Sequence, residues 1–269
     1  MRKKKKMTDW VSAICIANGI RIHYTRTGGG KRPLILLHGL NANGACWSAQ
    51  ARALEEEYDV IMPDARGHGL SSAPDYGYSY EDHANDVAGL METLELHKPI
   101  LIGHSMGGMS AAVAVSYNPR LFSGLVLADP SFLNPKVQRE VRDSDASDQH
   151  RRILNKSFEE VLEEIRLRHP ERSPELLEQC ARAQLQTRMS AFDVLTPPNP
   201  DYKLVVSKID VPTLIVLGDA GVVSISAAEE LKRINPLLQI EQIANAGHGL
   251  HYDQPERFST VVKSFLRSK

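Results

Sequence analysis

A serine flanked by glycines is the first feature of this sequence that could do chemistry. The segment Gly103-His104-Ser105-Met106-Gly107 fits the pattern Gly-x-Ser-x-Gly. It stands between an apolar run typical of a buried strand (99–103) and a small-residue segment typical of a helix (106–117). A sharp turn from strand to helix needs glycines, because the two backbones pass closely, and it lifts the serine hydroxyl above the strand end. This context predicts that Ser105 is a nucleophile.

The backbone N–H groups of Leu40 and Met106 are candidates for an oxyanion hole. A serine that attacks a carbonyl carbon needs two N–H donors for the negative charge that develops on the oxygen. The residue after the nucleophile, Met106, is expected to supply one of them. The loop 38–41, which follows an earlier apolar run, is expected to supply the other from Leu40.

Alternating strand-like and helix-like segments surround these motifs. Strands are expected at 33–38, 58–63, 99–103, 124–128, 212–218 and 240–244, and helices at 47–57, 80–96, 106–117, 226–234 and 255–266. This order predicts an α/β fold with a mostly parallel sheet and helices on both faces. Ahead of it, Asn18-Gly19 between two strand-like stretches (13–16 and 20–24) predicts a β-hairpin.

The segment from 133 to 204 differs from the rest of the chain. It is rich in Arg, Glu and Gln at helical spacing and contains no strand-like run, which is typical of about three helices. We interpret it as a helical lid over the carboxyl edge of the sheet, with helices packed at the side of the sheet as the alternative. The core domain then comprises 11–132 and 205–269, after a basic tail at 1–10.

Charge and cysteine content narrow the class of protein. Lys and Arg number 32 against 33 Asp and Glu, so the chain lacks the basic surplus of a nucleic-acid-binding protein. The longest apolar runs fall far short of the roughly 20 residues that span a bilayer. The 3 cysteines are not in Cys-x-x-Cys spacing, and no zinc-binding His pattern occurs, so neither a metal nor another cofactor is predicted. We expect a cytoplasmic protein that acts on a small molecule.

Six motifs, taken in order, resemble those of the α/β-hydrolase superfamily. They are HGL (38–40), DARGHGLS (64–71), GHSMGG (103–108), LVLADPS (125–131), PTLIVLGD (212–219) and AGHGLHYDQPERF (246–258). The resemblance extends from about residue 13 to residue 266. It implies an eight-stranded, mostly parallel sheet, a lid after the sixth strand, and a Ser-His-acid triad.

The same resemblance implies a base and leaves the acid open. His248 follows the last expected strand, where the family's base stands. The family's acid usually stands three residues after a glycine in the turn after the seventh strand, but that position is Gly221 here. Asp129, at the end of the sixth expected strand, is our first candidate for the acid, and Asp219 is the second.

Several other side chains are expected near the site. His104 lies beside the nucleophile, and Trp47, Phe132 and Phe192 are candidate substrate-binding residues, with plain core positions as the alternative. Asp64 in DARGHG is expected to fix a loop. The remaining histidines on polar helices are expected to face solvent, namely His83, His97, His150 and His169.

Together these features predict a serine hydrolase that cleaves a small or medium carboxylic ester or lactone through an acyl-enzyme. C–C bond hydrolysis, amide hydrolysis and perhydrolysis in the same site are alternatives, as is a ligand receptor that retains the pocket. The charged, aromatic-poor lid favours small or medium acyl groups over long chains. Nothing in the sequence indicates the oligomeric state.

Overall fold

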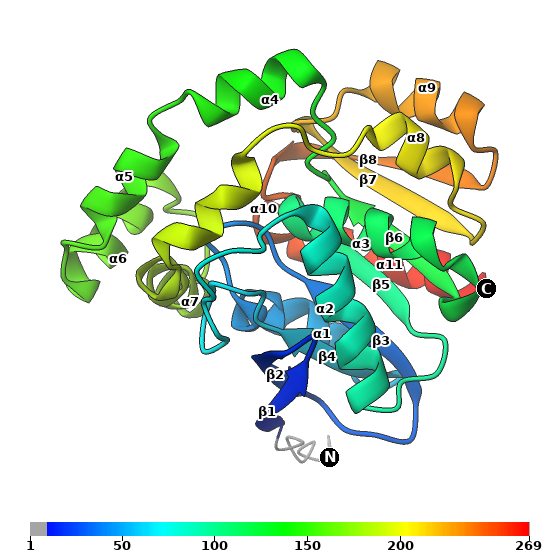
Figure 1. Ribbon diagram of the computed structural model, residues 1–269, viewed down its shortest axis with the longest axis horizontal. Coiled ribbons are helices and arrows are strands. Elements are labelled where there is room, and N and C mark those ends of the chain that lie inside the picture. The colour runs from blue at the N-terminus through cyan, green and yellow to red at the C-terminus, as the bar shows by residue number, and fades with distance from the viewer. Residues whose placement is uncertain (1–9, 269) are drawn as a thin grey trace, which may run out of the picture.

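One eight-stranded sheet runs through the part of the chain that the computed structural model describes, residues 10–268 (Figure 1). Its strand order is β1-β2-β4-β3-β5-β6-β7-β8. The strands are β1 (Val11–Ala17), β2 (Ile20–Arg26), β3 (Arg32–Leu37), β4 (Tyr58–Pro63), β5 (Ile100–His104), β6 (Gly124–Ala128), β7 (Thr213–Ala220) and β8 (Leu238–Gly247). Only β2 pairs antiparallel with its neighbours, β1 and β4, and the other five pairs are parallel. The predicted α/β class is therefore confirmed.

The hairpin at the start of the sheet also follows the sequence. Asn18 and Gly19 join β1 to β2 with φ angles of 49° and 75°, the positive values that a two-residue turn between right-twisted strands requires. The basic run at residues 2–6, expected as part of a tail, lies outside the described residues.

Helices cover both faces of the sheet. One face packs against α2 (Tyr80–Thr93), α3 (Met106–Tyr117), α8 (Tyr202–Ser207) and α9 (Ile225–Ile234). The other packs against α1 (Ser48–Leu54), α10 (Leu250–Asp253) and α11 (Pro255–Arg267). Along β3, Leu34 and Leu36 point to the second face, whereas Ile35 and Leu37 point to the first. Burial on both faces explains why the inner strands appear in the sequence as unbroken apolar runs.

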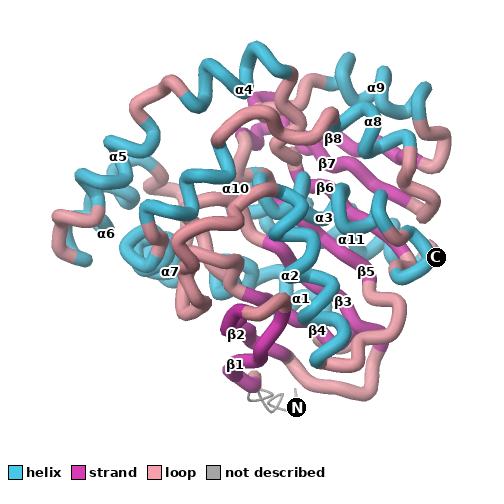
Figure 2. Tube along the Cα trace, in the orientation of Figure 1, coloured by secondary structure: helices cyan, strands magenta, loops and turns pink. Residues whose placement is uncertain are grey.

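A helical segment connects β6 to β7. It contains α4 (Pro135–Arg142), α5 (Ala146–Ile153), α6 (Phe158–Arg168), α7 (Pro174–Gln186) and the 3₁₀ helix η3 (Met189–Leu195), followed by α8. These are more helices than the three expected, because short breaks at 143–145 and 154–157 divide the pattern. Figure 2 shows α4 to α6 as an arc off one side of the sheet. The helices α6 and α7 share a small apolar core, and α7 packs against the 3₁₀ helix η1 (Gly44–Trp47).

The sheet order brings the functional motifs to one edge. Because β3, β5, β6 and β7 are parallel neighbours, the loops after their carboxyl ends lie side by side. Another 3₁₀ helix, η2 (Pro119–Leu121), lies at the opposite end of β6, where that strand begins. Within residues 10–268, every helix is too short or too polar to cross a lipid bilayer.

Candidate active site

Three of the predicted site residues form a continuous chain of hydrogen bonds. The Oγ atom of Ser105 lies 2.9 Å from Nε2 of His248. The other ring nitrogen of His248, Nδ1, lies 2.5 Å from Oδ2 of Asp129. The His248 side chain is 40% exposed, so a substrate can reach it, whereas the Asp129 side chain is fully buried. A hydroxyl, an imidazole and a buried carboxylate in this order can generate an activated oxygen nucleophile.

Ser105 stands at a strained turn. Its φ of 52° and ψ of −119° lie outside the regions that most residues adopt. The turn is possible because the neighbouring glycines let the backbones meet: a Cβ on Gly103 would lie 2.2 Å from the Gly107 carbonyl oxygen, and a Cβ on Gly107 would lie 2.3 Å from the Leu37 carbonyl oxygen. The strand-to-helix context predicted for Ser105 is thus present between β5 and α3.

Asp129 is held by backbone donors as well as by His248. Its Oδ2 accepts a hydrogen bond from the Val222 N–H at 2.8 Å, and its Oδ1 accepts one from the Val223 N–H at 2.9 Å. The carboxylate also accepts the hydrogen bond of the Nδ1–H of His248, which leaves Nε2 free to accept one from Ser105.

The turn after β7 makes room for this carboxylate. A Cβ on Gly221 would lie 2.8 Å from both carboxylate oxygens of Asp129. The acid position that the sequence motif would assign to residue 221 is therefore filled from the neighbouring strand, by the side chain of Asp129.

Asp219 has a different environment. It lies on the solvent side of the end of β7, and its carboxylate accepts hydrogen bonds from the N–H groups of Asn245 (2.8 Å) and Ala246 (3.0 Å). These bonds lower the pKa of Asp219. They tie β7 to the end of β8, just before His248, and none joins Asp219 to the imidazole. Of the two carboxylates considered, only Asp129 contacts His248.

The two N–H groups proposed for an oxyanion hole, those of Leu40 and Met106, are free to bind a substrate oxygen. A turn closed by the Ala42 N–H on the Gly39 carbonyl leaves the Leu40 N–H unused, and the φ of 63° at Asn41 is that of a type II turn. Met106 is the first residue of α3, where the N–H has no partner within the helix. Among the described residues, neither N–H donates to another protein group.

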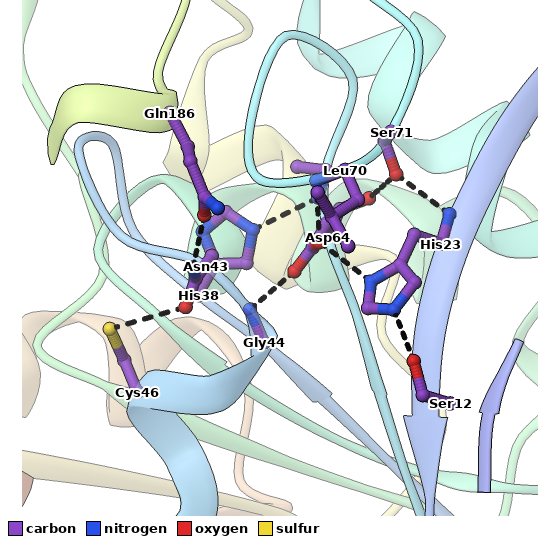
Figure 3. A network of polar contacts seen from close by, with 11 residues as sticks. Ser12, His23, His38, Asn43, Gly44, Cys46, Asp64, Leu70, Ser71 and Gln186 are labelled. Atoms are coloured by element: carbon purple, nitrogen blue, oxygen red, sulfur yellow. Dashed lines mark hydrogen bonds and ion pairs between the residues drawn. The ribbon is translucent and has the colours of Figure 1, made fainter. Parts of the chain in front are cut away.

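A polar network anchors the loop that carries Leu40 (Figure 3). Asp64, after β4, accepts hydrogen bonds from the Gly44 N–H at 2.7 Å and the Leu70 N–H at 2.9 Å, and contacts Nδ1 of His23 at 2.8 Å. Burial opposes its ionisation, but the bonds from His23 and the backbone outweigh burial and lower the pKa of Asp64. Asp64 therefore fixes loops, as expected.

His38 completes the same support. Its Nε2 accepts the Ala65 N–H at 2.9 Å, so the ring proton lies on Nδ1 and is donated to the Gly39 carbonyl at 2.8 Å. Burial lowers the pKa of His38, which keeps the ring neutral. His38 of the HGL motif is thus a neutral side chain that supports the loop. It takes no part in the hydrogen bond between Ser105 and His248.

His104 lies behind His248. Its Nε2 donates to the carbonyl oxygen of His248 at 2.8 Å, and the two ring centroids are 4.7 Å apart. Burial, followed by the neighbouring His248, lowers the pKa of His104 to about 3. A neutral, buried ring in this position orients the backbone of His248, and it leaves little surface for the substrate contact we considered.

The three candidate aromatic residues are all buried. Trp47 is 0% exposed and stacks on His251 in the layer with α11, which makes it a core residue. Phe132 stacks on Tyr202 of α8, and Phe192 stacks on His150.

The expectation that all four remaining histidines face solvent is wrong for His83 and His150, which are buried. Each lies on the inward side of its helix: His83 packs beside Tyr80 at the start of α2, and His150 bonds to the Thr187 carbonyl.

Two site residues were missed by sequence reasoning. Ser131 places its Oγ 3.2 Å from that of Ser105. Asp253 accepts the Gly247 N–H and pairs with Arg172 of the helical segment at 2.6 Å. Both belong to motifs quoted above, LVLADPS and AGHGLHYDQPERF, but only the fold brings them to His248 and Ser105. Among residues 10–268, no group of three His, Cys, Asp or Glu side chains is arranged to hold a metal ion.

The fold and this arrangement define a hydrolase of the α/β class. The family model described as "alpha/beta hydrolase fold" matches residues 32–255, which is most of the chain. The chain therefore belongs to the α/β-hydrolase family.

Named relatives lie at moderate identity. The chain is 29% identical over 250 residues to the 2-(acetamidomethylene)succinate hydrolase of Mesorhizobium japonicum, covering 88% of this chain and 89% of that protein. It is 30% identical over 254 residues to the mouse sn-1-specific diacylglycerol lipase ABHD11, covering 87% and 80%. Among solved structures, a thermophilic esterase from Thermogutta terrifontis superposes with a TM-score of 0.75 at 26% identity, covering 96% and 98%.

Proposed function

We propose that this hydrolase cleaves small or medium carboxylic esters or lactones through an acyl-enzyme on Ser105. The observation that carries the proposal is the unbroken chain from Ser105 Oγ through His248 to the buried Asp129 carboxylate. The similarity to a diacylglycerol lipase and to a thermophilic esterase, both of which are named for ester cleavage, supports this bond type.

In the proposed reaction, Ser105 attacks the carbonyl carbon while His248 Nε2 takes the hydroxyl proton. Asp129 holds the imidazole in the required tautomer and stabilises the imidazolium. The N–H groups of Leu40 and Met106 receive the oxyanion. His248 then gives its proton to the leaving alcohol, and a water molecule releases the acyl group by the same steps.

We further propose that residues 133–204 act as a lid that limits substrate size. The segment reaches the site at specific points: Gln186 accepts a hydrogen bond from Asn43, next to the oxyanion loop, at 3.0 Å, and Arg172 pairs with Asp253 beside His248. The three cysteines, all free, and the near-neutral charge support a cytoplasmic enzyme with a small-molecule substrate and no nucleic-acid partner.

The ester proposal is tested with p-nitrophenyl acetate and p-nitrophenyl butyrate. The wild-type protein should release p-nitrophenol with turnover, and Ser105→Ala should lose at least about 10³-fold in kcat, because the nucleophile is gone. A wild-type rate no greater than that of Ser105→Ala would contradict the proposal.

Amide hydrolysis is the second candidate, favoured by the relative named for hydrolysis of 2-(acetamidomethylene)succinate. The same nucleophile and base would act, but the leaving group would be an amine that must receive the His248 proton before it departs. Short N-acyl compounds should therefore be measured beside the esters. A kcat/KM higher for these amides than for the esters would replace the ester proposal with this one.

A further inference from the structure

A second serine hydroxyl lies at the nucleophile. Ser131 Oγ is 3.2 Å from Ser105 Oγ. Two backbone hydrogen bonds fix this separation, because the Ser105 N–H donates to the Ala128 carbonyl at 3.2 Å and the Ser131 N–H donates to the Ser105 carbonyl at 3.1 Å. The end of β6 is thus held against the turn that carries Ser105, which keeps the backbones of the two serines adjacent.

A buried tyrosine stands behind Ser131. Tyr80, at the start of α2, is 3% exposed, and the Ser131 side chain lies near enough to its hydroxyl to influence the pKa of the phenol. Burial raises the pKa of Tyr80 to about 12, so the phenol keeps its proton at neutral pH and can donate it.

The surrounding groups determine which way the hydroxyl protons point. The Asp129 carboxylate accepts a hydrogen bond from the Nδ1–H of His248, so Nε2 accepts a hydrogen bond from the Ser105 hydroxyl. Ser105 Oγ then has only lone pairs to offer to Ser131. The 3.2 Å contact between the two hydroxyls therefore has Ser131 as the donor and Ser105 Oγ as the acceptor.

We propose that Ser131 is a catalytic residue whose hydroxyl donates a hydrogen bond to Ser105 Oγ when that oxygen leaves the acyl-enzyme. This inference rests on the function proposed above. In deacylation, water adds to the acyl carbon as His248 takes a proton from it. The C–Oγ bond then breaks, its electron pair goes to Oγ, and the His248 Nε2 proton completes the Ser105 hydroxyl. The Ser131 proton stays on Ser131 throughout.

The bond strengthens only where Oγ gains negative charge. An ester oxygen is a weak acceptor, whereas a departing oxygen is a strong one, so the donor stabilises the deacylation transition state more than the acyl-enzyme. In acylation the free hydroxyl of Ser105 already accepts this bond, which therefore gives little acceleration. Loss of Ser131 should slow deacylation selectively.

The test is the pre-steady-state hydrolysis of p-nitrophenyl butyrate by the full-length protein. In Ser131→Ala we expect the burst, which reports acylation, to keep its rate within about twofold, and deacylation to slow about 10-fold, the effect of one such hydrogen bond. Steady-state kcat and KM should fall together while kcat/KM stays constant. Intact-mass measurement should find more butyryl-enzyme than in the wild type.

Three further variants separate a chemical from a structural role. Ser131→Thr keeps the hydroxyl and should restore deacylation. Tyr80→Phe keeps both serines but removes the hydroxyl beside Ser131, and should slow deacylation alone, by a few-fold. Ser116→Ala, at the far end of α3, where that hydroxyl bonds only to the Val113 carbonyl, should behave as the wild type.

Equal losses in acylation and deacylation, or an unchanged deacylation rate in Ser131→Ala, would overturn the role of Ser131. A wild-type protein without Ser105-dependent turnover would instead overturn the proposed function, a separate result that concerns Ser105 alone.

Discussion

At the scale of single residues, the chemistry of the site depends on which atom of each hydrogen bond carries the proton. The carboxylate of Asp129 accepts hydrogen bonds from the Val222 and Val223 N–H groups and from Nδ1 of His248. This fixes the imidazole tautomer and directs the Ser105 hydroxyl toward Nε2. By contrast, the carboxylate oxygens of Asp219 accept hydrogen bonds from backbone N–H groups of β8.

Asparagine substitutions distinguish the two carboxylates. Asp129→Asn removes the charge that stabilises the imidazolium and offers an amide that cannot hold the same tautomer, so kcat should fall by about 10³–10⁴-fold. Asp219→Asn should stay within about tenfold of the wild type, because its hydrogen bonds reach only the loop before His248. Both kcat values are measured on p-nitrophenyl butyrate. A large loss confined to Asp219→Asn would contradict this assignment.

At the scale of secondary-structure elements, the parallel pairing of β5, β6 and β7 brings three strand exits together. The exit of β5 carries Ser105, the exit of β6 carries Asp129 and Ser131, and the turn after β7 supplies the Val222 and Val223 N–H groups. The geometry of the site therefore depends on how these adjacent turns pack together. A side chain added in one turn can displace a side chain that another turn carries.

Gly221→Ala tests this coupling between turns. The added methyl group would lie 2.8 Å from both oxygens of Asp129 and should displace the carboxylate from His248. A shift of this kind is expected to lower kcat by about 10²-fold. Gly124→Ala, at the start of β6, is the matched control, because its Cβ would meet only ordinary contacts at 3.6 Å or more. If both variants keep wild-type kcat, the turn after β7 tolerates a side chain and the coupling is absent.

At the scale of the whole molecule, the interior holds several neutral histidines. Burial lowers the pKa values of His83 and His104 to about 3, well below the 6.5 of an exposed imidazole. Below pH 6.5 the unfolded chain takes up protons at these sites and the folded chain does not. The contribution of these histidines to the free energy of unfolding should therefore be fully present above pH 6.5. It should decrease as the pH falls toward 3.

His83 carries this contribution at a position outside the hydrogen-bonded chain from Ser105 to Asp129. Between pH 7.5 and pH 5.5 its share of the lost unfolding free energy is about 1.4 kcal/mol. Urea unfolding of His83→Gln should therefore lose less stability over this interval than the wild type, by about that amount. His97→Gln, which changes an exposed imidazole, should follow the wild type. A His83→Gln curve parallel to the wild-type curve would show that His83 does not carry this effect.

The sequence by itself determined the fold and the local motif of the nucleophile. Unbroken apolar runs such as 99–103 and 124–128 indicated strands buried on both faces, and their alternation with helices left few topologies. Ser105 was identifiable because the glycines at 103 and 107 are a local requirement of its turn.

Only the tertiary structure decided which carboxylate lies against His248 and which hydroxyl lies against Ser105. Asp129 and His248 are 119 residues apart in the chain, and Ser131 and Ser105 are 26 apart. No local pattern records such contacts, because they follow from the pairing of β6 between β5 and β7 and from the missing Cβ at Gly221. The burial of His83, His150 and the candidate aromatic residues has the same cause: each depends on what packs over its helix or loop.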